Sequence, residues 1–219
     1  ELPLAEFFSA SGDPSDEHLR WLGDLSGVHW IGAKMGSGQM HVTGNVGRHL
    51  GSEMTGGEIA VDGDASDWVG AEMRGGTIRV SGSAGHLIGA AYRGSAVGMR
   101  GGDILVHGDL GNELGHTLRR GLIAVGGSCG DLAGFNMLAG TILVFGGCGI
   151  RHGAGMKRGT IGLLGDSRPN LLPTFRYASR ARPLAIIMVF RELAAMGFVI
   201  PEPLLACQFD LYHGDFLEG

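Results

Sequence analysis

Apolar and polar residues alternate over short stretches that return every 19 residues through the middle of the chain. Each stretch opens with a glycine and carries apolar residues at the third and fifth positions of the unit, as Ile59 and Val61 do. Alternation with a period of two predicts a short strand with one face turned inward. The opening glycines are Gly38, Gly57, Gly76, Gly102, Gly121, Gly140 and Gly159. Seven tandem copies predict a solenoid and not a compact mixed fold.

Other columns of the unit, counted from its opening glycine, are equally regular. Positions 9 and 13 are mostly small or aliphatic, so each coil has a second inward side. Position 17 is methionine in every copy except one, where Leu118 stands, and methionine is a flexible filler for an interior stack. Glycines at positions 1, 7, 10 and 14 suit a chain that turns back every four to six residues. The columns predict an all-β fold: a single-stranded, right-handed parallel β-helix of about seven coils.

The chain divides into three predicted segments. Residues 1–31 are aperiodic and carry a helix-start signal at Asp13-Pro14-Ser15, so we expect an N-terminal cap. Residues 32–166 are the glycine-rich β-helix repeats. Residues 167–219 are a C-terminal extension with a helix over 184–196, which follows Pro183 and stops at Gly197. Both ends of a β-helix need covering, because unpaired strand edges invite aggregation.

The outward positions of the strands change character along the chain. They are polar in the early coils, as at His41 and Asp62, and become apolar later, at Leu105, Leu143 and Phe145. An outward face that turns apolar is a covered face. We expect the C-terminal helix to cover it, and another subunit is the alternative.

One interval in the repeat is 26 residues instead of 19. The extra residues fall between Gly89 and Met99, so residues 90–98 are expected to bulge from the side of the rod. Insertions in solenoids commonly sit on one face and touch a partner. Tyr92 and Arg93 are therefore candidate partner contacts.

Composition and charge narrow the classes of function. The net charge of −5 argues against bulk attraction to nucleic acid. The three cysteines have no C-x-x-C spacing, so neither a disulfide framework nor a structural zinc site is expected. No signal peptide is visible at Glu1, and the longest apolar stretch, residues 184–190, is too short to span a bilayer. We expect a cytoplasmic protein without a membrane partner.

Candidate catalytic groups are few. Cys129 and Cys148 share inward position 9, where two stacked small residues are a better interpretation than a redox pair. The nine histidines lack metal-binding spacing, and His107 and His116, although in one coil, should point to different sides. We therefore predict no catalytic residue and no metal site on this chain.

A column of basic residues is the most informative polar feature. We call it the basic stripe, and it comprises Arg74, Arg100, Arg119, Arg120, Lys157 and Arg158, at positions 18 and 19 of the unit. Like charges stacked about 5 Å apart need compensation. Either acidic side chains of neighbouring loops pair with them, or they form a track for a polyanionic ligand or an acidic subunit surface.

The repeated phrase G-x-x-M-x-x-G-x-I-x-V-x-G, complete from Gly70 to Gly82, closely resembles the repeat of the formylmethanofuran dehydrogenase C subunits. It is closer still to that of the C subunits found in bacterial formyltransferase/hydrolase complexes, and the resemblance extends through Pro173-Thr174-Phe175 and Tyr212-His213-Gly214-Asp215. A related β-helix forms the C-terminal domain of the glutamate synthase large chain. Arginine outnumbers lysine 15 to 2, which favours the bacterial complex.

The resemblance implies a non-catalytic scaffold subunit. Such a complex transfers a formyl group from formyl-tetrahydromethanopterin through formylmethanofuran, or its bacterial analogue, to formate during formaldehyde oxidation. The chemistry belongs to an amidohydrolase-like A subunit with a metal centre and a formyltransferase D subunit, beside a B subunit. The coenzyme carries a polyglutamate tail, so the basic stripe becomes a candidate surface for it, while no cofactor is assigned to this chain itself. The alternatives are the corresponding scaffold of a molybdenum or tungsten formylmethanofuran dehydrogenase and a glutamate-synthase-type β-helix domain.

Overall fold

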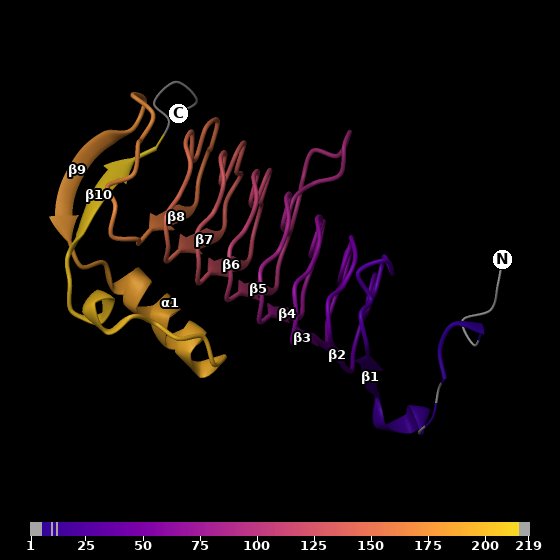
Figure 1. The fold of residues 1–219 in the computed structure, drawn as a ribbon. Helices are drawn as coiled ribbons and strands as arrows, with labels where there is room; N and C mark the ends of the chain where they lie inside the picture. Colours follow the sequence, from indigo (N-terminus) through magenta and orange to yellow (C-terminus); the bar gives the residue numbers. More distant parts are fainter. Residues whose placement is uncertain (1–5, 10, 12, 215–219) are drawn as a thin grey trace.

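The repeats form one parallel sheet whose strands lie side by side in chain order, one strand per coil (Figure 1). This computed structural model describes residues 6–9, 11 and 13–214. The strands of the sheet are β1 (His18–Leu22), β2 (Gln39–Thr43), β3 (Glu58–Val61), β4 (Thr77–Val80), β5 (Asp103–Val106), β6 (Leu122–Val125), β7 (Thr141–Val144) and β8 (Thr160–Leu163). Equivalent positions of successive units are paired, so Ile59 lies beside Ile78 and Ile78 beside Ile104. The predicted all-β solenoid is confirmed.

The first coil lies inside the segment expected to be a cap, and this corrects both the boundary at residue 31 and the number of coils. β1 pairs in parallel with β2, with His18 opposite Gln39, and Leu25 pairs with Val46. The spacing from His18 to its partner is 21 residues, and no glycine opens the strand, so the 19-residue period hides this coil. The expected helix start is present as the 3-10 helix η2 (Pro14–Asp16), capped by Asp13 Oδ1, which accepts a hydrogen bond from Ser15 N–H at 2.9 Å. The outermost parts of the expected cap and extension, residues 1–5 and 215–219, lie outside the described residues.

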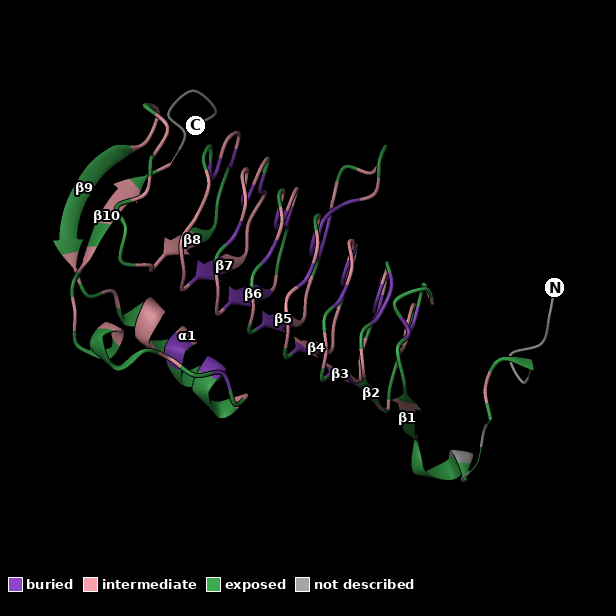
Figure 2. Ribbon diagram, viewed as in Figure 1, coloured by how far each residue is buried: buried purple, intermediate pink, exposed green. Residues whose placement is uncertain are grey.

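Aliphatic columns fill the interior of the rod, as the periodicity predicts. Ile59, Ile78 and Ile104 are fully buried, and so are the methionines of unit position 17 in the middle coils, such as Met54 and Met73. Figure 2 shows the buried residues concentrated on the middle strands. Aromatic rings complete the two ends: Phe8 packs edge-on against Trp21 at the first coil, and Phe175 packs against the core at the last.

Two further columns of polar side chains join the coils, and the periodicity of apolar residues gave no sign of them. Asp64 Oδ1 accepts a hydrogen bond from Ser83 N–H of the next coil at 2.7 Å, and Asn112 Oδ1 accepts one from Asp131 N–H at 2.9 Å. The accepting side chains are Asn45, Asp64, Ser83, Asp109 and Ser128 in one column and His29, Asp67, His86, Asn112 and Asp131 in the other. Each bond contributes about 0.5–1.5 kcal/mol, so these polar groups hold the stack together.

The C-terminal extension packs on the outward side of the late strands. It contains β9 (Arg176–Ala181), α1 (Leu184–Ala195), the 3-10 helix η3 (Glu202–Leu205) and β10 (Phe209–His213), with β9 and β10 antiparallel. Phe190 and Leu193 of α1 form a second core with Leu105 and Leu143 of the sheet. The apolar outward face is therefore covered by the chain's own helix, as expected. No helix among the described residues is long and apolar enough to cross a membrane.

Candidate functional site: the basic stripe and the insertion

The solenoid places the arginines of the basic stripe at the same point of successive coils. Arg74 donates its backbone N–H to Met54 O at 2.8 Å, and Arg119 donates its own to Met99 O at 2.9 Å. Arg100 stands between them in the coil order. Parallel strands of a sheet lie about 4.8 Å apart, so the three guanidinium groups leave the rod one rung apart. All six members of the stripe are exposed.

The described residues offer the stripe no acidic partner. The ion pairs of arginine within them join Arg48 to Asp67 at 3.6 Å, Arg79 to Glu58, and Arg180 to Asp210 at 3.9 Å. The first of the two interpretations, pairing with acidic side chains of neighbouring loops, is therefore not met in this part of the chain. The carboxylates of Asp64, Asp109 and Asp131 instead accept hydrogen bonds within the polar columns.

A shallow depression of about 390 Å³ lies on the stripe. It is lined by Arg100, Arg119, Arg120 and Val97. The first three belong to successive parts of the stripe, and Val97 comes from the insertion. Lys157 and Arg158 lie two coils further on, with Leu138 at the intervening place, and do not line the depression. The structure thus brings half of the predicted basic residues into one site.

The insertion projects between β4 and β5, as the long interval predicts (Figure 1). Its Tyr92 folds back onto the rings of Trp68, His49 and Trp30, with centroid distances of 5.4, 5.7 and 6.2 Å. Burial raises the pKa of the Tyr92 phenol. Arg93, by contrast, is exposed. Tyr92 therefore anchors the loop, and Arg93 remains available to a partner.

The three rings under Tyr92 form a column that sequence reasoning overlooked. Trp30, His49 and Trp68 stand 19 residues apart, so the signal was present in the same period. Trp30 and His49 are stacked at 4.0 Å with a 7° interplanar angle. Desolvation lowers the pKa of His49, with a smaller contribution from His29. This neutral, stacked ring serves as the seat of the insertion.

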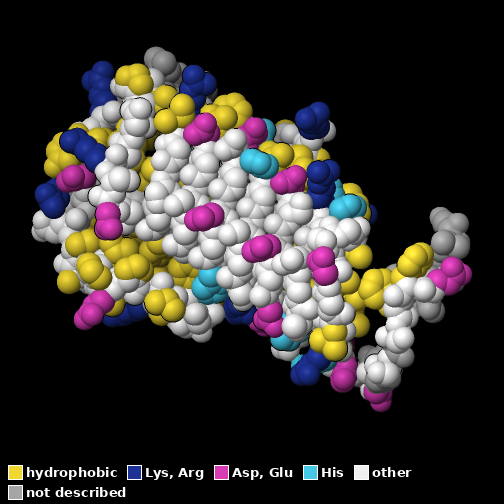
Figure 3. Space-filling model, viewed as in Figure 1, with side chains coloured by type: hydrophobic (Ala, Val, Ile, Leu, Met, Phe, Trp, Pro, Cys, Tyr) yellow, Lys and Arg dark blue, Asp and Glu magenta, His cyan; other side chains and the backbone are white. Residues whose placement is uncertain are grey.

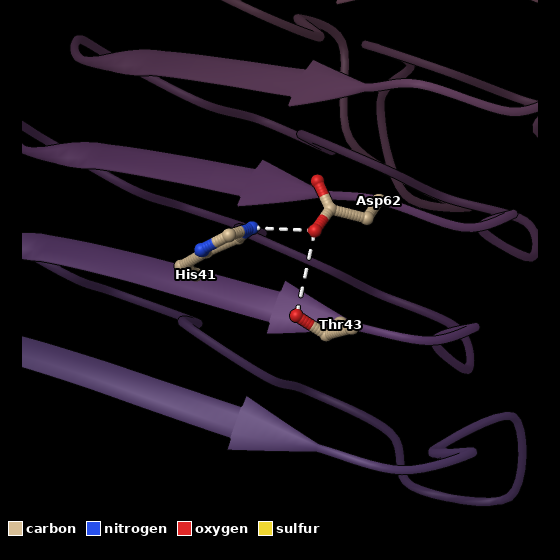
Figure 4. Close-up of polar contacts among 3 residues, drawn as sticks. All are labelled: His41, Thr43 and Asp62. Atoms are coloured by element: carbon tan, nitrogen blue, oxygen red, sulfur yellow. Dashed lines mark hydrogen bonds and ion pairs between the residues drawn. The ribbon is translucent and has the colours of Figure 1, made fainter.

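A histidine, an aspartate and a threonine meet on the outward face of β2 and β3 (Figure 4). His41 Nε2 lies 2.8 Å from Asp62 Oδ2, and the Thr43 hydroxyl donates to the same oxygen at 3.4 Å. A nucleophilic relay would need the hydroxyl bonded to the imidazole. Here both groups bind one carboxylate oxygen, so the arrangement links two strands and does not activate Thr43.

The remaining candidate groups stay apart, in agreement with the expectation from their unit positions. His107 stacks on Phe198 at 5.1 Å, whereas His116 lies 3.3 Å from Glu113. Cys129 and Cys148 are paired neighbours with free thiols, and burial raises the pKa of Cys129 to about 12, which keeps it a thiol. Within the described residues, no three His, Cys, Asp or Glu side chains are grouped to hold a metal ion.

Fold and surface define a glycine-rich parallel β-solenoid that carries a basic depression and a docked C-terminal helix. A family model described as the GXGXG motif matches residues 28–171, so the chain belongs to the GXGXG motif family. It is also similar to a chain of the crystal structure of the formyltransferase/hydrolase complex (FhcABCD) from Methylorubrum extorquens in complex with methylofuran. The two are 33% identical with a TM-score of 0.87, and the match covers 96% of this chain and 77% of the other. No curated protein sequence gives a significant match. The family resemblance predicted from the repeat is confirmed.

Proposed function

We propose that this chain is a non-catalytic scaffold subunit of a formyltransferase/hydrolase complex. Such a complex passes a formyl group from formyl-tetrahydromethanopterin, by way of a methanofuran-type coenzyme, to formate. The observation that carries the proposal is the 33% identity and TM-score of 0.87 to a chain of that complex, across 96% of this chain. Its partners are an amidohydrolase-like A subunit with a metal centre, a B subunit and a formyltransferase D subunit.

The polar side chains of the solenoid support a scaffold role. Those of the two polar columns accept backbone hydrogen bonds from the next coil, and Asp62 links β2 to β3 through His41 and Thr43. Carboxylates and imidazoles that would be natural acids, bases or ligands are thereby employed in stiffening the rod. A stiff rod with separate docking faces suits the assembly of other subunits.

Purification of the intact assembly from the native host tests this proposal. Native mass spectrometry of the tagged chain should show a formyltransferase subunit and an amidohydrolase-like subunit in fixed ratio, with no molybdenum or tungsten. A molybdenum or tungsten subunit with iron–sulfur partners would instead indicate a formylmethanofuran dehydrogenase. Glutaminase and flavin subunits would indicate a glutamate-synthase-type domain, and a stable monomer with formyl-transferring activity of its own would contradict the scaffold role.

We infer further that the basic stripe holds the polyglutamate tail of the coenzyme. The stripe offers cations at rung spacing without an acidic partner among the described residues, and the depression gives Arg100, Arg119 and Arg120 a common ligand space. Carboxylates are the natural bidentate partners of guanidinium groups. Val97 makes the insertion one wall of this site.

Replacing Arg100, Arg119 and Arg120 with serine should weaken binding of an oligoglutamate peptide by about 10- to 100-fold at low salt, because exposed ion pairs contribute about 0.2–1 kcal/mol each and three act together. The salt dependence of binding should fall as well. Calorimetric titration at two salt concentrations measures both. The matched control replaces Arg20, Arg93 and Arg151, which are equally exposed, and should bind like the unaltered chain. Equal losses in both variants would reduce the effect to net charge and exclude the site.

A further inference from the structure

The outer side of α1 is apolar although it faces solvent. Leu184 and Met188 lie one turn apart on the helix and are 71% and 61% exposed, while Phe190 and Leu193 on the other side are buried. The exposed Val199, just beyond the helix, extends this surface. Figure 3 shows hydrophobic side chains gathered over α1, whereas the face over the coils is mostly glycine and backbone. A helix that is apolar on all sides is normally buried on all sides.

The β9–β10 ribbon beside α1 is also incompletely packed. It has two strands, and five of the six residues of β9 are exposed. Tyr177 on β9 is 58% exposed and meets Tyr212 of β10 edge-on at 5.7 Å. A two-stranded ribbon is marginally stable alone, and a packed partner stabilises it. The ribbon and α1 thus share the same need for a covering surface.

Positive charge surrounds this apolar centre. Residues 167–191 hold five arginines and no Asp or Glu. Arg168 bonds to the neutral hydroxyl of Tyr212 at 3.5 Å, and Arg182 bonds to the backbone carbonyl of Leu205. Arg180 is 3.9 Å from Asp210, and Arg191 forms no ion pair within the described residues. Most of this positive charge is not neutralised by the chain itself.

We propose that the outer face of α1, together with β9, docks a partner subunit that presents an apolar helix face bordered by Asp and Glu. This rests on the proposed function, which supplies an assembly in which such a subunit exists. An apolar centre with a polar rim is the anatomy of a protein interface, and arginine is enriched there. The exposed Ala185 and Ala195 flank the Leu184–Met188 ridge, so a helix ridge can approach closely.

The test measures assembly of the purified Met188→Glu chain with the subunits that co-purify with the unaltered chain. A carboxylate in the apolar centre, facing an acidic rim, should raise the dissociation constant at least about 30-fold. Arg191→Glu should raise it less and lower its salt dependence. The control is Leu22→Glu, an apolar residue 79% exposed on β1 at the other end of the rod, which should bind within about threefold. Unchanged melting temperatures show that both variants remain folded.

Binding of Met188→Glu and of Leu184→Glu equal to that of the control would overturn the proposal. Light scattering of the chain alone addresses a second copy as occupant: a dimer that Met188→Glu separates would contradict the docking of another subunit. Co-sedimentation with vesicles containing anionic lipid, lost in Met188→Glu, would likewise reassign the face to a membrane surface. The proposed function fails separately, because it depends on the identity of the co-purifying subunits and not on Met188.

Discussion

Gly102→Ala should lower the free energy of unfolding by about 3 kcal/mol or more. Gly102 has φ +89°, a conformation that costs an L-residue about 1–2 kcal/mol. A Cβ there would lie 2.5 Å from Gly76 O of the preceding coil, closer than any real contact of this kind. The obstructing atom is backbone, held in place by its own pairing, so relief requires the coils to separate. Urea unfolding followed by circular dichroism measures the loss.

Gly27→Ala is the matched control. No atom of another residue lies within 4 Å of a Cβ at Gly27, and its φ is not in the left-handed region. Its unfolding free energy should stay within about 0.5 kcal/mol of the unaltered chain. Equal stability of the two variants would mean that the coils do not stack in the register described.

Phe190→Ala should release the C-terminal extension from the rod while the coils stay folded. Phe190 is 3% exposed and packs near Phe145 and Phe209, with centroid distances of 6.0 and 6.4 Å. Removal of a buried phenylalanine costs about 3–5 kcal/mol, which is large against the docking of one short helix. Amide hydrogen exchange should accelerate in α1 and the β9–β10 ribbon and stay slow in β3 to β7.

Met188→Ala controls for the change in helix composition, since Met188 is on the same helix and 61% exposed. Its exchange pattern should match that of the unaltered chain. Continued protection of α1 in Phe190→Ala would show that the second core does not hold the helix. Loss of protection throughout the coils would show that the extension is needed to keep the rod folded.

The architecture was predictable because a strict period leaves few choices. Equivalent positions of a 19-residue unit must lie beside each other, so Ile59, Ile78 and Ile104 could be placed in one column from the sequence alone. The apolar outward positions likewise predicted the covering helix. The first coil escaped because its 21-residue spacing interrupts the period at the end of the array, where no earlier repeat supports it.

The candidate site was less predictable, for physical reasons. A column position fixes where Arg100 or Arg119 leaves the backbone, but the side chain's partner depends on long, flexible rotamers. The carboxylates expected to compensate the stripe instead accept backbone hydrogen bonds, as at Asp109. Val97 joins the depression through the path of an insertion that no repeat specifies. The Trp30, His49 and Trp68 column could have been found by following one more position of the unit.

The proposed scaffold role means that this chain assembles the complex and leaves the chemistry to other subunits. Formate release from a formylated methanofuran-type coenzyme, measured on assemblies reconstituted with and without this chain, tests that role most directly. We expect the complete assembly to be active, the assembly lacking this chain to dissociate on gel filtration and lose coupled formyl transfer, and the isolated chain to be inactive. An assembly that stays intact and fully active without this chain would contradict the scaffold role, as would formate release by the chain alone.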